Sequence, residues 1–247
     1  EKSERYYHVI YLLHGAAQNE NWWVHSGGVV ETLNKAIAEG TIPPSIVVMP
    51  YCGEFSWYVN HINGKAPVED YIIEELLPHV DKNYRTIKSD ATYYRSRQFR
   101  AIGGLSMGGY GAMHLAMRHP NKFAVSFALS GAFTAPEDIS LDSYARANKV
   151  FGDPVDIEYA KKYDPATIVK EKGKKIKTLR YFLSIGDDDH LLSSNMKLYK
   201  TMENAGYKVE LRVHDGGHDN YYWRNNLREA LGYVKSVWIP FGPMYVD

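Results

Sequence analysis

The segment Gly103-Gly104-Leu105-Ser106-Met107-Gly108-Gly109 contains the pattern G-x-S-x-G, and the rest of the chain is best interpreted outward from it. With Gly and Ser each near ~7% of an average composition, the bare pattern should occur by chance in roughly one chain of this length in ten. It therefore needs support from its context, which for a nucleophilic serine is a short apolar strand, a sharp turn of small residues and a helix. Residues 98–102 fit the strand and residues 110–118 fit the helix. The segment predicts a strand, turn and helix that present Ser106.

Apolar runs elsewhere predict strands that alternate with helices. Strands buried on both faces are predicted by the continuous hydrophobicity of residues 6–13, 45–50, 123–129 and 179–185, and residues 208–213 predict a further strand. Helical spacing predicts helices over residues 29–39, 68–84, 193–205 and 222–237. Pro78 should kink or split the second of these helices. The alternation indicates an α/β fold with a mainly parallel central sheet and helices on both faces.

The length of 247 residues suits one sizeable core, so we expect residues 1–247 to form a single domain. Residues 134–172 interrupt the alternation, because they lie between two predicted strands and carry short, mixed signals with two Asp-Pro pairs. We expect this segment to be a lid or cap insertion. A segment that only packs against the core is the alternative.

The charge balance argues against several classes of partner. Lys plus Arg equals Asp plus Glu at 29 each, so no overall field favours nucleic acid or an anionic membrane surface. The one basic run, residues 170–177, is interrupted by Gly173 and is typical of a solvated loop. No apolar run approaches membrane-spanning length. The single Cys52 cannot form an internal disulfide.

A serine hydroxyl needs a neighbouring base to take its proton as it attacks. Of the 10 histidines, four lie in predicted strands or helices or at a helix end, where packed or surface histidines are common: His8, His79, His114 and His119. His25 and His61 lie in loops and stay open as candidates. His218 differs from them, because the loop 215–219 that carries it follows a predicted strand and precedes the last helix. That position places His218 at the carboxyl edge of the sheet, where Ser106 also emerges.

The third member of such a site is a carboxylate that holds the imidazole in the right tautomer. Asp187, Asp188 and Asp189 are candidates, since they follow the predicted strand at residues 179–185. The order Ser, Asp, His along the chain is the one expected for an α/β-hydrolase arrangement.

Acyl transfer also needs two donors for the oxyanion that forms during attack. The amide of Met107 is placed by the turn itself. The second donor should come from the loop His14-Gly15-Ala16 after the first strand.

A metal site is the competing interpretation of the acidic and histidine residues. His214 and His218 are four residues apart, and aspartates adjoin His190. Gly216 and Gly217 make a helix there unfavourable, so the spacing does not put the two histidines on one face. We therefore expect neither a metal nor another cofactor.

Four motifs in this order resemble the esterase D-like α/β-hydrolases, a group that includes bacterial feruloyl esterases of xylanase systems, tributyrin-type esterases and, more distantly, mycolyltransferases. The motifs are Leu12-Leu13-His14-Gly15, the Gly-Leu-Ser-Met-Gly-Gly turn, Gly-x-x-Asp at 186–189 and Gly-Gly-His-Asp at 216–219. The resemblance covers residues 6–238 and is more specific for fold and triad than for substrate.

The resemblance selects among the open candidates. It implies Asp189 as the carboxylate, with Asp188 second, and Ala16 as the second oxyanion donor. Trp57 and Tyr58 match a family loop beside the active site and are candidate substrate-binding residues. Two further aromatic candidates, Trp23 and Trp223, follow from their positions near the first strand and next to His218, where packing roles are equally common.

The resemblance also implies an activity, namely a serine carboxylesterase that hydrolyses hydroxycinnamoyl esters of plant cell-wall polysaccharide through an acyl-enzyme. Acetyl-xylan or short-chain acyl esterases and acyltransferases are the alternatives, and a non-catalytic carbohydrate-binding module is the alternative from another class. The expected partner is a small or polysaccharide-linked ester. The expected setting is secreted or extracellular and bacterial, within a larger polypeptide.

Two departures from the family pattern concern the ends of the chain. Family members carry one or two strands before the segment that matches residue 6, so we expect the sequence to be a trimmed or excised module with an incomplete sheet edge. The apolar tail at residues 238–245 is expected to cover a sheet edge or contact a partner.

Overall fold

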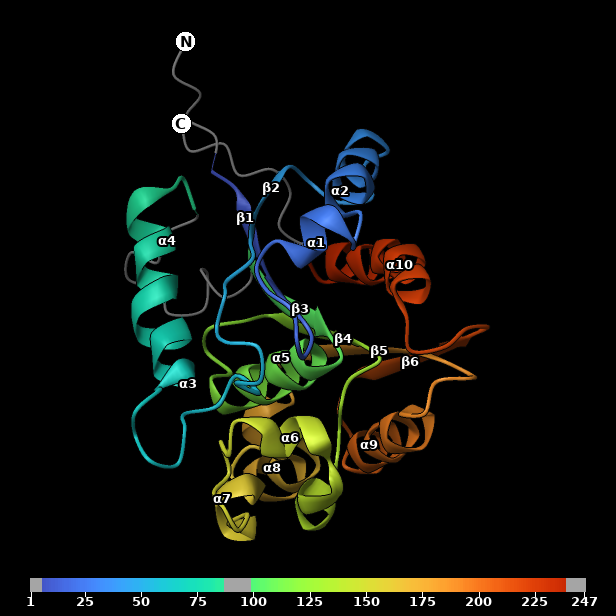
Figure 1. The fold of residues 1–247 in the computed structure, drawn as a ribbon. Helices are drawn as coiled ribbons and strands as arrows, with labels where there is room; N and C mark the ends of the chain where they lie inside the picture. Colours follow the sequence, from blue (N-terminus) through green and yellow to red (C-terminus); the bar gives the residue numbers. More distant parts are fainter. Residues whose placement is uncertain (1–5, 87–98, 239–247) are drawn as a thin grey trace.

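A six-stranded parallel sheet forms the centre of the computed structural model, which describes residues 6–86 and 99–238, without the side chains of residues 174 and 175 (Figure 1). The strands are β1 (His8–Leu13), β2 (Ser45–Val48), β3 (Arg100–Leu105), β4 (Val125–Leu129), β5 (Arg180–Gly186) and β6 (Val209–His214). Their order across the sheet is β2-β1-β3-β4-β5-β6, and every neighbouring pair is parallel. The expected α/β-hydrolase fold is confirmed.

Alternate residues of the strands face two separate apolar layers. Ile10 and Leu12 of β1 pack with helices α2 (Val29–Ala38) and α10 (Asn220–Trp238) on one face. Tyr11 and Leu13 face the opposite layer. That layer contains α4 (Leu77–Asn83), α5 (Met107–Arg118), α8 (Pro165–Lys172) and α9 (Leu192–Asn204) (Figure 1). Continuous apolar runs form these strands because both faces are covered.

The expectation of full burial is wrong for β2. All four of its residues are half-buried, whereas β3 and β4 are buried along their whole length. The reason is position, because among the described strands β2 lies at one end of the order and pairs on one side only.

The predicted helix at residues 68–84 is divided by a wide turn rather than by a kink at the proline. Its parts are α3 (Val68–Asp70), a π-helical turn η1 (Tyr71–Leu76) and α4 (Leu77–Asn83). Pro78 lies in the first turn of α4. A proline lacks an N–H and its ring crowds the preceding turn, and the π turn accommodates it by widening the helix just before it.

Residues 134–176 form short helices between β4 and β5: η3 (Pro136–Leu141), α6 (Ser143–Ala147), α7 (Ile157–Lys161), α8 and η4 (Gly173–Ile176). Asp142, Asp156 and Asp164 cap α6, α7 and α8 by accepting hydrogen bonds from first-turn amides. Buried side chains such as Phe151 and Ile168 join the core beneath α5. A lid function for residues 134–172 stays a prediction.

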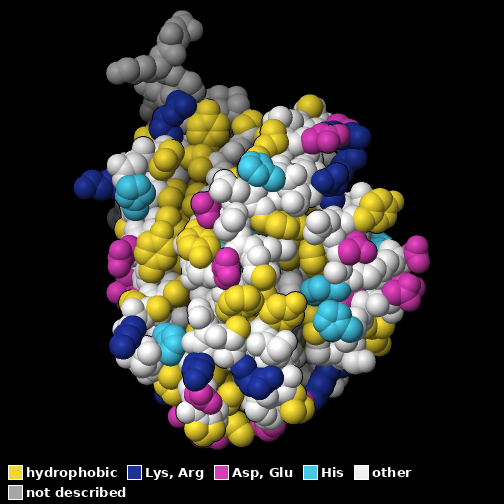
Figure 2. Space-filling view, viewed as in Figure 1, with side chains coloured by type: hydrophobic (Ala, Val, Ile, Leu, Met, Phe, Trp, Pro, Cys, Tyr) yellow, Lys and Arg dark blue, Asp and Glu magenta, His cyan; other side chains and the backbone are white. Residues whose placement is uncertain are grey.

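The surface carries both charge signs without a dominant basic patch on the face in Figure 2, where Lys and Arg are mixed with Asp and Glu. Among the described residues, no helix is both long and apolar enough to span a bilayer.

A short helix, α1 (Trp22–His25), follows the loop after β1. Of the predicted apolar tail at residues 238–245, Trp238 ends α10 and is buried in the core. Residues 239–245 lie outside the described part of the chain, so the role of the tail stays a prediction.

Candidate active site

Ser106 occupies a strained turn between β3 and α5. Its φ of 51° and ψ of −119° form a backbone conformation that residues other than glycine rarely adopt. The turn is held in place because the Ser106 amide donates to Leu129 O at 2.9 Å and the Ser106 carbonyl accepts from the Ala132 amide at 3.1 Å. These contacts attach the turn to the end of the neighbouring strand β4 and leave the hydroxyl at the carboxyl edge of the sheet.

Gly108 allows the first turn of α5 to approach β1. A Cβ atom at this position would lie 2.5 Å from Leu13 O and 2.6 Å from His14 O, distances that real side chains do not show. The last glycine of the G-x-S-x-G pattern, Gly108, is therefore required by the close contact between α5 and the end of β1, where the loop 14–18 begins.

His218 contacts both other members of the predicted triad. Its Nε2 atom lies 3.1 Å from Ser106 Oγ, and its Nδ1 atom lies 2.8 Å from Asp189 Oδ2. A carboxylate only accepts, so Nδ1–H donates to Asp189 and Nε2 is left to accept the serine proton. The arrangement has the polarity that a serine nucleophile needs.

Asp189 is buried and ionised. Its side chain is 0% exposed, and its Oδ1 atom accepts a hydrogen bond from the Leu191 amide at 2.9 Å. Burial alone raises the pKa of Asp189, but the hydrogen bonds from His218 and Leu191 outweigh burial and hold the pKa below its ordinary value. The carboxylate is thus charged at neutral pH and can stabilise a protonated His218.

Asp187 and Asp188 are exposed and do not contact His218. They connect the loop that follows β5 with the loop that carries His218. The Asp188 amide donates to Gly216 O at 3.0 Å, and Asp187 Oδ1 accepts from the Gly216 amide at 3.1 Å. A Cβ atom on Gly186 would lie 2.0 Å from Gly216 O. The glycine of the Gly-x-x-Asp motif thus permits the close approach that brings Asp189 to His218.

The loop after β1 reaches the same cavity as Ser106. Ala16 and Met107 both line this cavity, which has a volume of about 260 Å³. Met107 is the first residue of α5, so its amide has no acceptor within the helix. The Gly15 amide donates to Gln18 Oε1 at 2.8 Å and the Ala17 amide to Glu54 O at 2.9 Å, which fixes the loop on either side of Ala16.

The four aromatic candidates divide into two pairs. Trp57 and Trp223 line the cavity. Trp23 and Tyr58 are not among the lining residues and are both 0% exposed within the core, so the structure does not bring these two candidates to the cavity. The Trp23 indole donates to Leu13 O at 3.0 Å and the Tyr58 hydroxyl to His14 O at 2.9 Å. Both therefore support the loop that carries Ala16 from beneath.

Sequence reasoning missed several residues of the cavity wall, among them Asp142, Tyr144 and His190. His190 directly follows the aspartate run, so its position at the strand end was a usable signal. Tyr144 and Asp142 come from the segment between β4 and β5, which has no periodicity that places individual side chains.

Two histidines that sequence reasoning left open are not among the residues that line the cavity. His61 contacts Asn148 O at 2.9 Å, and His25 ends the short helix α1. His214 of the alternative metal site lies 2.7 Å from Glu229 on α10, so it does not pair with His218. Ligand atoms of Asp189, His190 and His218 lie within 4.8 Å of one another, but two of these residues are already engaged in the triad.

The chain resembles known proteins along most of its length. A family model described as a putative esterase matches residues 1–234. An acetyl esterase of Caldicellulosiruptor saccharolyticus is 27% identical over 93% of this chain and 84% of its own length. The endo-1,4-beta-xylanase/feruloyl esterase of Xylanibacter ruminicola is 31% identical over 92% of this chain, and this chain spans 26% of that protein. The solved structure of a ferulic acid esterase is 31% identical and superposes with a TM-score of 0.79 over 95% of this chain and 87% of its own.

Proposed function

Because the chain belongs to the putative esterase family, we propose that it hydrolyses hydroxycinnamoyl esters, above all feruloyl esters of plant cell-wall polysaccharide, through an acyl-enzyme on Ser106. The chain is a carboxylic-ester hydrolase with the α/β-hydrolase fold. The observation that carries the proposal is the hydrogen-bonded series Ser106, His218 and Asp189, which opens into a cavity flanked by two indole rings.

In the acylation step, Ser106 Oγ attacks the ester carbonyl while its proton passes to His218 Nε2. Asp189 stabilises the imidazolium that forms. The carbonyl oxygen becomes an oxyanion, for which the amides of Met107 and Ala16 are the proposed donors. The tetrahedral intermediate then collapses, the ester C–O bond breaks, and His218 returns the proton to the leaving alcohol.

In the deacylation step, a water molecule takes the place of the alcohol. His218 Nε2 accepts a proton from this water as its oxygen attacks the acyl carbonyl. The second tetrahedral intermediate releases the carboxylic acid, and the proton on His218 returns to Ser106 Oγ. The site is then restored, so the reaction consumes one ester and one water and needs no cofactor.

The cavity wall supports an aromatic acyl group. Trp57, Tyr144 and Trp223 come from different segments and all border the space next to Ser106. Flat aromatic groups bury their faces against such rings at favourable stacking or edge-to-face distances. The relatives named feruloyl or ferulic acid esterase, each 31% identical, support the same choice.

An acetyl esterase is the second candidate, favoured by the acetyl esterase that matches 93% of this chain and by a cavity of only about 260 Å³. We further propose an extracellular setting within a larger polypeptide, as supported by the xylanase-linked relative of which this chain spans 26%. An acyltransferase would use the same acyl-enzyme and would reveal itself by acylated sugar products.

The two acyl groups can be compared on a common leaving group, with 4-nitrophenyl ferulate and 4-nitrophenyl acetate. We expect kcat/KM to be at least about tenfold higher for the ferulate, the factor that a few apolar contacts in a fitted pocket provide. Ser106→Ala should remove turnover of both esters. Faster turnover of the acetate would reverse the choice of substrate, and residual turnover in the Ser106→Ala protein would remove the proposed nucleophile.

A further inference from the structure

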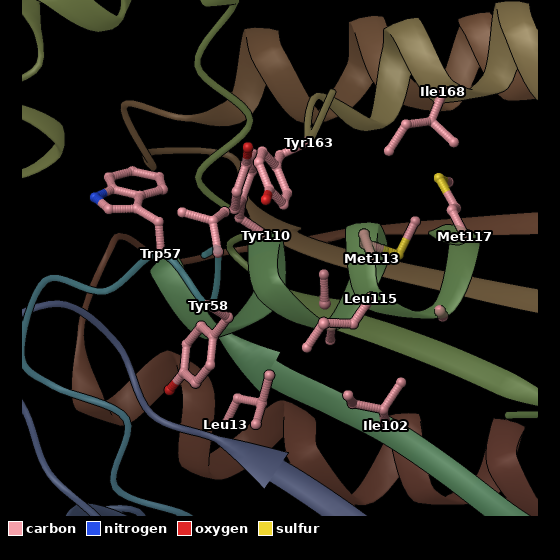
Figure 3. Close-up of a cluster of buried hydrophobic side chains, with 14 of the residues drawn as sticks. Leu13, Trp57, Tyr58, Ile102, Tyr110, Met113, Leu115, Met117, Tyr163 and Ile168 are labelled. Atoms are coloured by element: carbon pink, nitrogen blue, oxygen red, sulfur yellow. The ribbon is translucent and has the colours of Figure 1, made fainter. Parts of the chain in front are cut away.

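Residues 56–60, which we call the Trp57 loop, have an unusual backbone. Trp57 and Tyr58 are consecutive and both have positive φ, 52° and 58°. Bulky side chains rarely adopt this conformation, and it persists where the surrounding structure enforces it. The two side chains point apart in Figure 3: Tyr58 extends toward Leu13 and the sheet, and Trp57 extends away from it. The strained backbone therefore sends one aromatic ring to the core and the other to the cavity.

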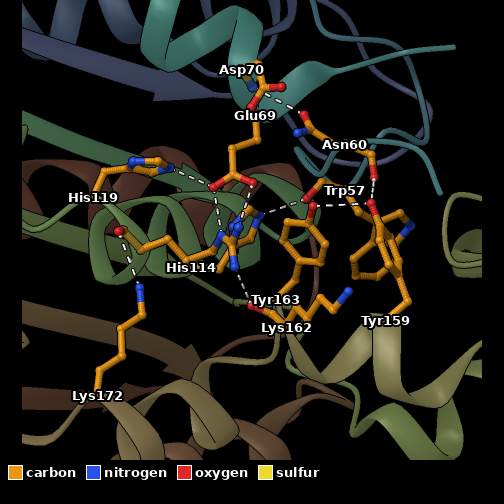
Figure 4. Close-up of polar contacts among 11 residues, drawn as sticks. Trp57, Asn60, Glu69, Asp70, His114, His119, Tyr159, Lys162, Tyr163 and Lys172 are labelled. Atoms are coloured by element: carbon orange, nitrogen blue, oxygen red, sulfur yellow. Dashed lines mark hydrogen bonds and ion pairs between the residues drawn. The ribbon is translucent and has the colours of Figure 1, made fainter. Parts of the chain in front are cut away.

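His114 on α5 holds this backbone at Trp57. Its side chain is fully buried, and its Nε2 atom donates to Trp57 O at 3.1 Å (Figure 4). Burial lowers the pKa of His114 to about 3, so the ring is neutral at working pH and carries its proton on Nε2. His114 lies eight residues after Ser106 along the helix, a rise of ~12 Å, and so does not take part in proton transfer.

Packing alone does not account for a histidine at this position. Among the described residues, His114 Nδ1 is buried with no hydrogen-bond partner. Burying an imidazole with one unpaired nitrogen is costly, and an apolar side chain of similar size would avoid that cost. The single side-chain hydrogen bond that His114 makes in the described structure goes to the Trp57 carbonyl, and that contact is the gain that offsets its burial.

Three further hydrogen bonds attach the Trp57 loop to its surroundings. The Trp57 amide donates to Met107 Sδ at 3.4 Å, and the Trp57 indole N–H donates to Tyr144 O at 3.4 Å. At the far end of the loop, the Tyr159 hydroxyl donates to Asn60 O at 2.7 Å. The loop is thus held between α5 and the segment that follows β4.

A partly buried ion pair between Arg118 and Glu69 supports His114 through the Tyr163 ring. Arg118 Nε and Nη2 contact the two carboxylate oxygens of Glu69 at 2.7 and 3.1 Å (Figure 4). The Arg118 guanidinium lies over the Tyr163 ring, 4.6 Å from its centre, and that ring packs edge-on against His114 at 5.5 Å. Glu69 and Arg118 therefore fix Tyr163, which in turn confines the imidazole.

We propose that His114 is a positioning residue that sets acyl selectivity, by holding the Trp57 carbonyl and so fixing the Trp57 indole as one wall of the acyl cavity. The role rests on the proposed function of the Ser106 site. It predicts that loss of the hydrogen bond weakens binding of a flat aromatic acyl group far more than binding of an acetyl group, because an acetyl group is too small to need that wall.

The test compares His114→Phe, which keeps a ring but loses the donor, with His114→Gln, which keeps an N–H close to the position of Nε2. KM and kcat are measured for 4-nitrophenyl ferulate and 4-nitrophenyl acetate. We expect His114→Phe to raise KM for the ferulate about tenfold, the effect of losing one buried hydrogen bond. KM for the acetate should stay within about twofold, and His114→Gln should recover most of the ferulate affinity.

A matched control separates positioning from general destabilisation. Tyr207→Phe also removes buried side-chain hydrogen bonds, to Val169 O and Gly173 O, far along the chain from the Trp57 loop. It should lower stability and leave both KM values unchanged. If His114→Phe fails to fold, Tyr159→Phe removes the bond to Asn60 O and should raise KM for the ferulate in the same direction.

The outcomes distinguish this inference from the proposed function. Wild-type protein that does not turn over the ferulate would overturn the proposed substrate. If the wild-type protein turns over the ferulate, and His114→Phe changes KM for both esters equally or for neither, only the positioning role would be overturned.

Discussion

The triad and the acyl cavity wall adjoin each other but are built in different ways. Ser106, Asp189 and His218 each follow the carboxyl end of a strand, β3, β5 and β6, and short contacts between loops bring them together. Trp57 and Tyr144 lie 87 residues apart in the sequence, and their two segments are joined by several contacts, among them the hydrogen bond from the Trp57 indole to Tyr144 O. The comparison teaches that the chemistry rests on the sheet, whereas selectivity rests on segments fastened by buried polar groups.

The largest expected loss of activity comes from a substitution within the triad itself. Asp189→Asn should lower kcat about 10⁴-fold, because the amide no longer fixes the Nδ1–H tautomer of His218. For Asp188→Asn, at the exposed neighbouring position, kcat should stay within about twofold of the wild-type value. Steady-state kinetics with 4-nitrophenyl acetate measures both. Equal losses in the two variants would remove the distinction between these aspartates.

A smaller effect is expected at the support of the serine turn. Gly108→Ala places a Cβ atom against Leu13 O and His14 O, so Ser106 and the loop with Ala16 should separate and kcat should fall about 10²-fold. Gly232→Ala on α10 is the matched control, since among the described residues its Cβ would meet Thr41 alone, at an ordinary contact distance of 3.9 Å. The control should keep full activity and gain up to about 1 kcal/mol of stability. Full activity in Gly108→Ala would contradict the required close approach.

The smallest expected effect is on the pH dependence of folding stability, to which the buried His114 contributes. Burial lowers the pKa of His114 from 6.5 to about 3, so between these values the unfolded chain binds a proton that the folded protein does not. Stability therefore falls as pH drops below 6.5. Between about pH 7 and pH 5 this contributes a loss of about 2 kcal/mol, which His114→Phe should remove.

Urea denaturation of both proteins at the two pH values measures this difference. Glu69 has a similar effect only at lower pH. Burial raises its pKa, but the hydrogen bonds from His119 and Arg118 outweigh burial and hold the pKa at about 2, so the stability that Glu69 contributes is lost as pH falls below 4.5. An identical pH dependence in wild type and His114→Phe would mean that His114 is not buried and neutral.

The sheet and triad could be predicted from sequence because their signals are local. Continuous apolar runs mark strands buried on both faces, and the turns that follow them carry Ser106, the aspartate run and His218. Geometry in the structure selects Asp189 among the three aspartates, since it alone of them contacts His218 while Asp187 and Asp188 are exposed. Sequence could favour Asp189 only through resemblance.

The cavity wall could not be predicted to the same depth, because it depends on long-range contacts. Trp23 and Tyr58 are aromatic like Trp57 and Trp223, yet the first two support the loop 14–18 and the other two line the cavity. Which way each ring points depends on backbone conformation, such as the positive φ at both Trp57 and Tyr58. No local pattern in the sequence encodes that geometry.

The most direct test of the central claim is to detect the acyl-enzyme. During turnover of 4-nitrophenyl ferulate, the protein is quenched with acid, digested with trypsin and analysed by mass spectrometry. The account predicts the added mass of one feruloyl group on the peptide of residues 101–118, carried by Ser106 and absent from the Ser106→Ala protein. A feruloyl group found on another residue, or turnover with no acylated peptide in the quenched wild-type protein, would contradict it.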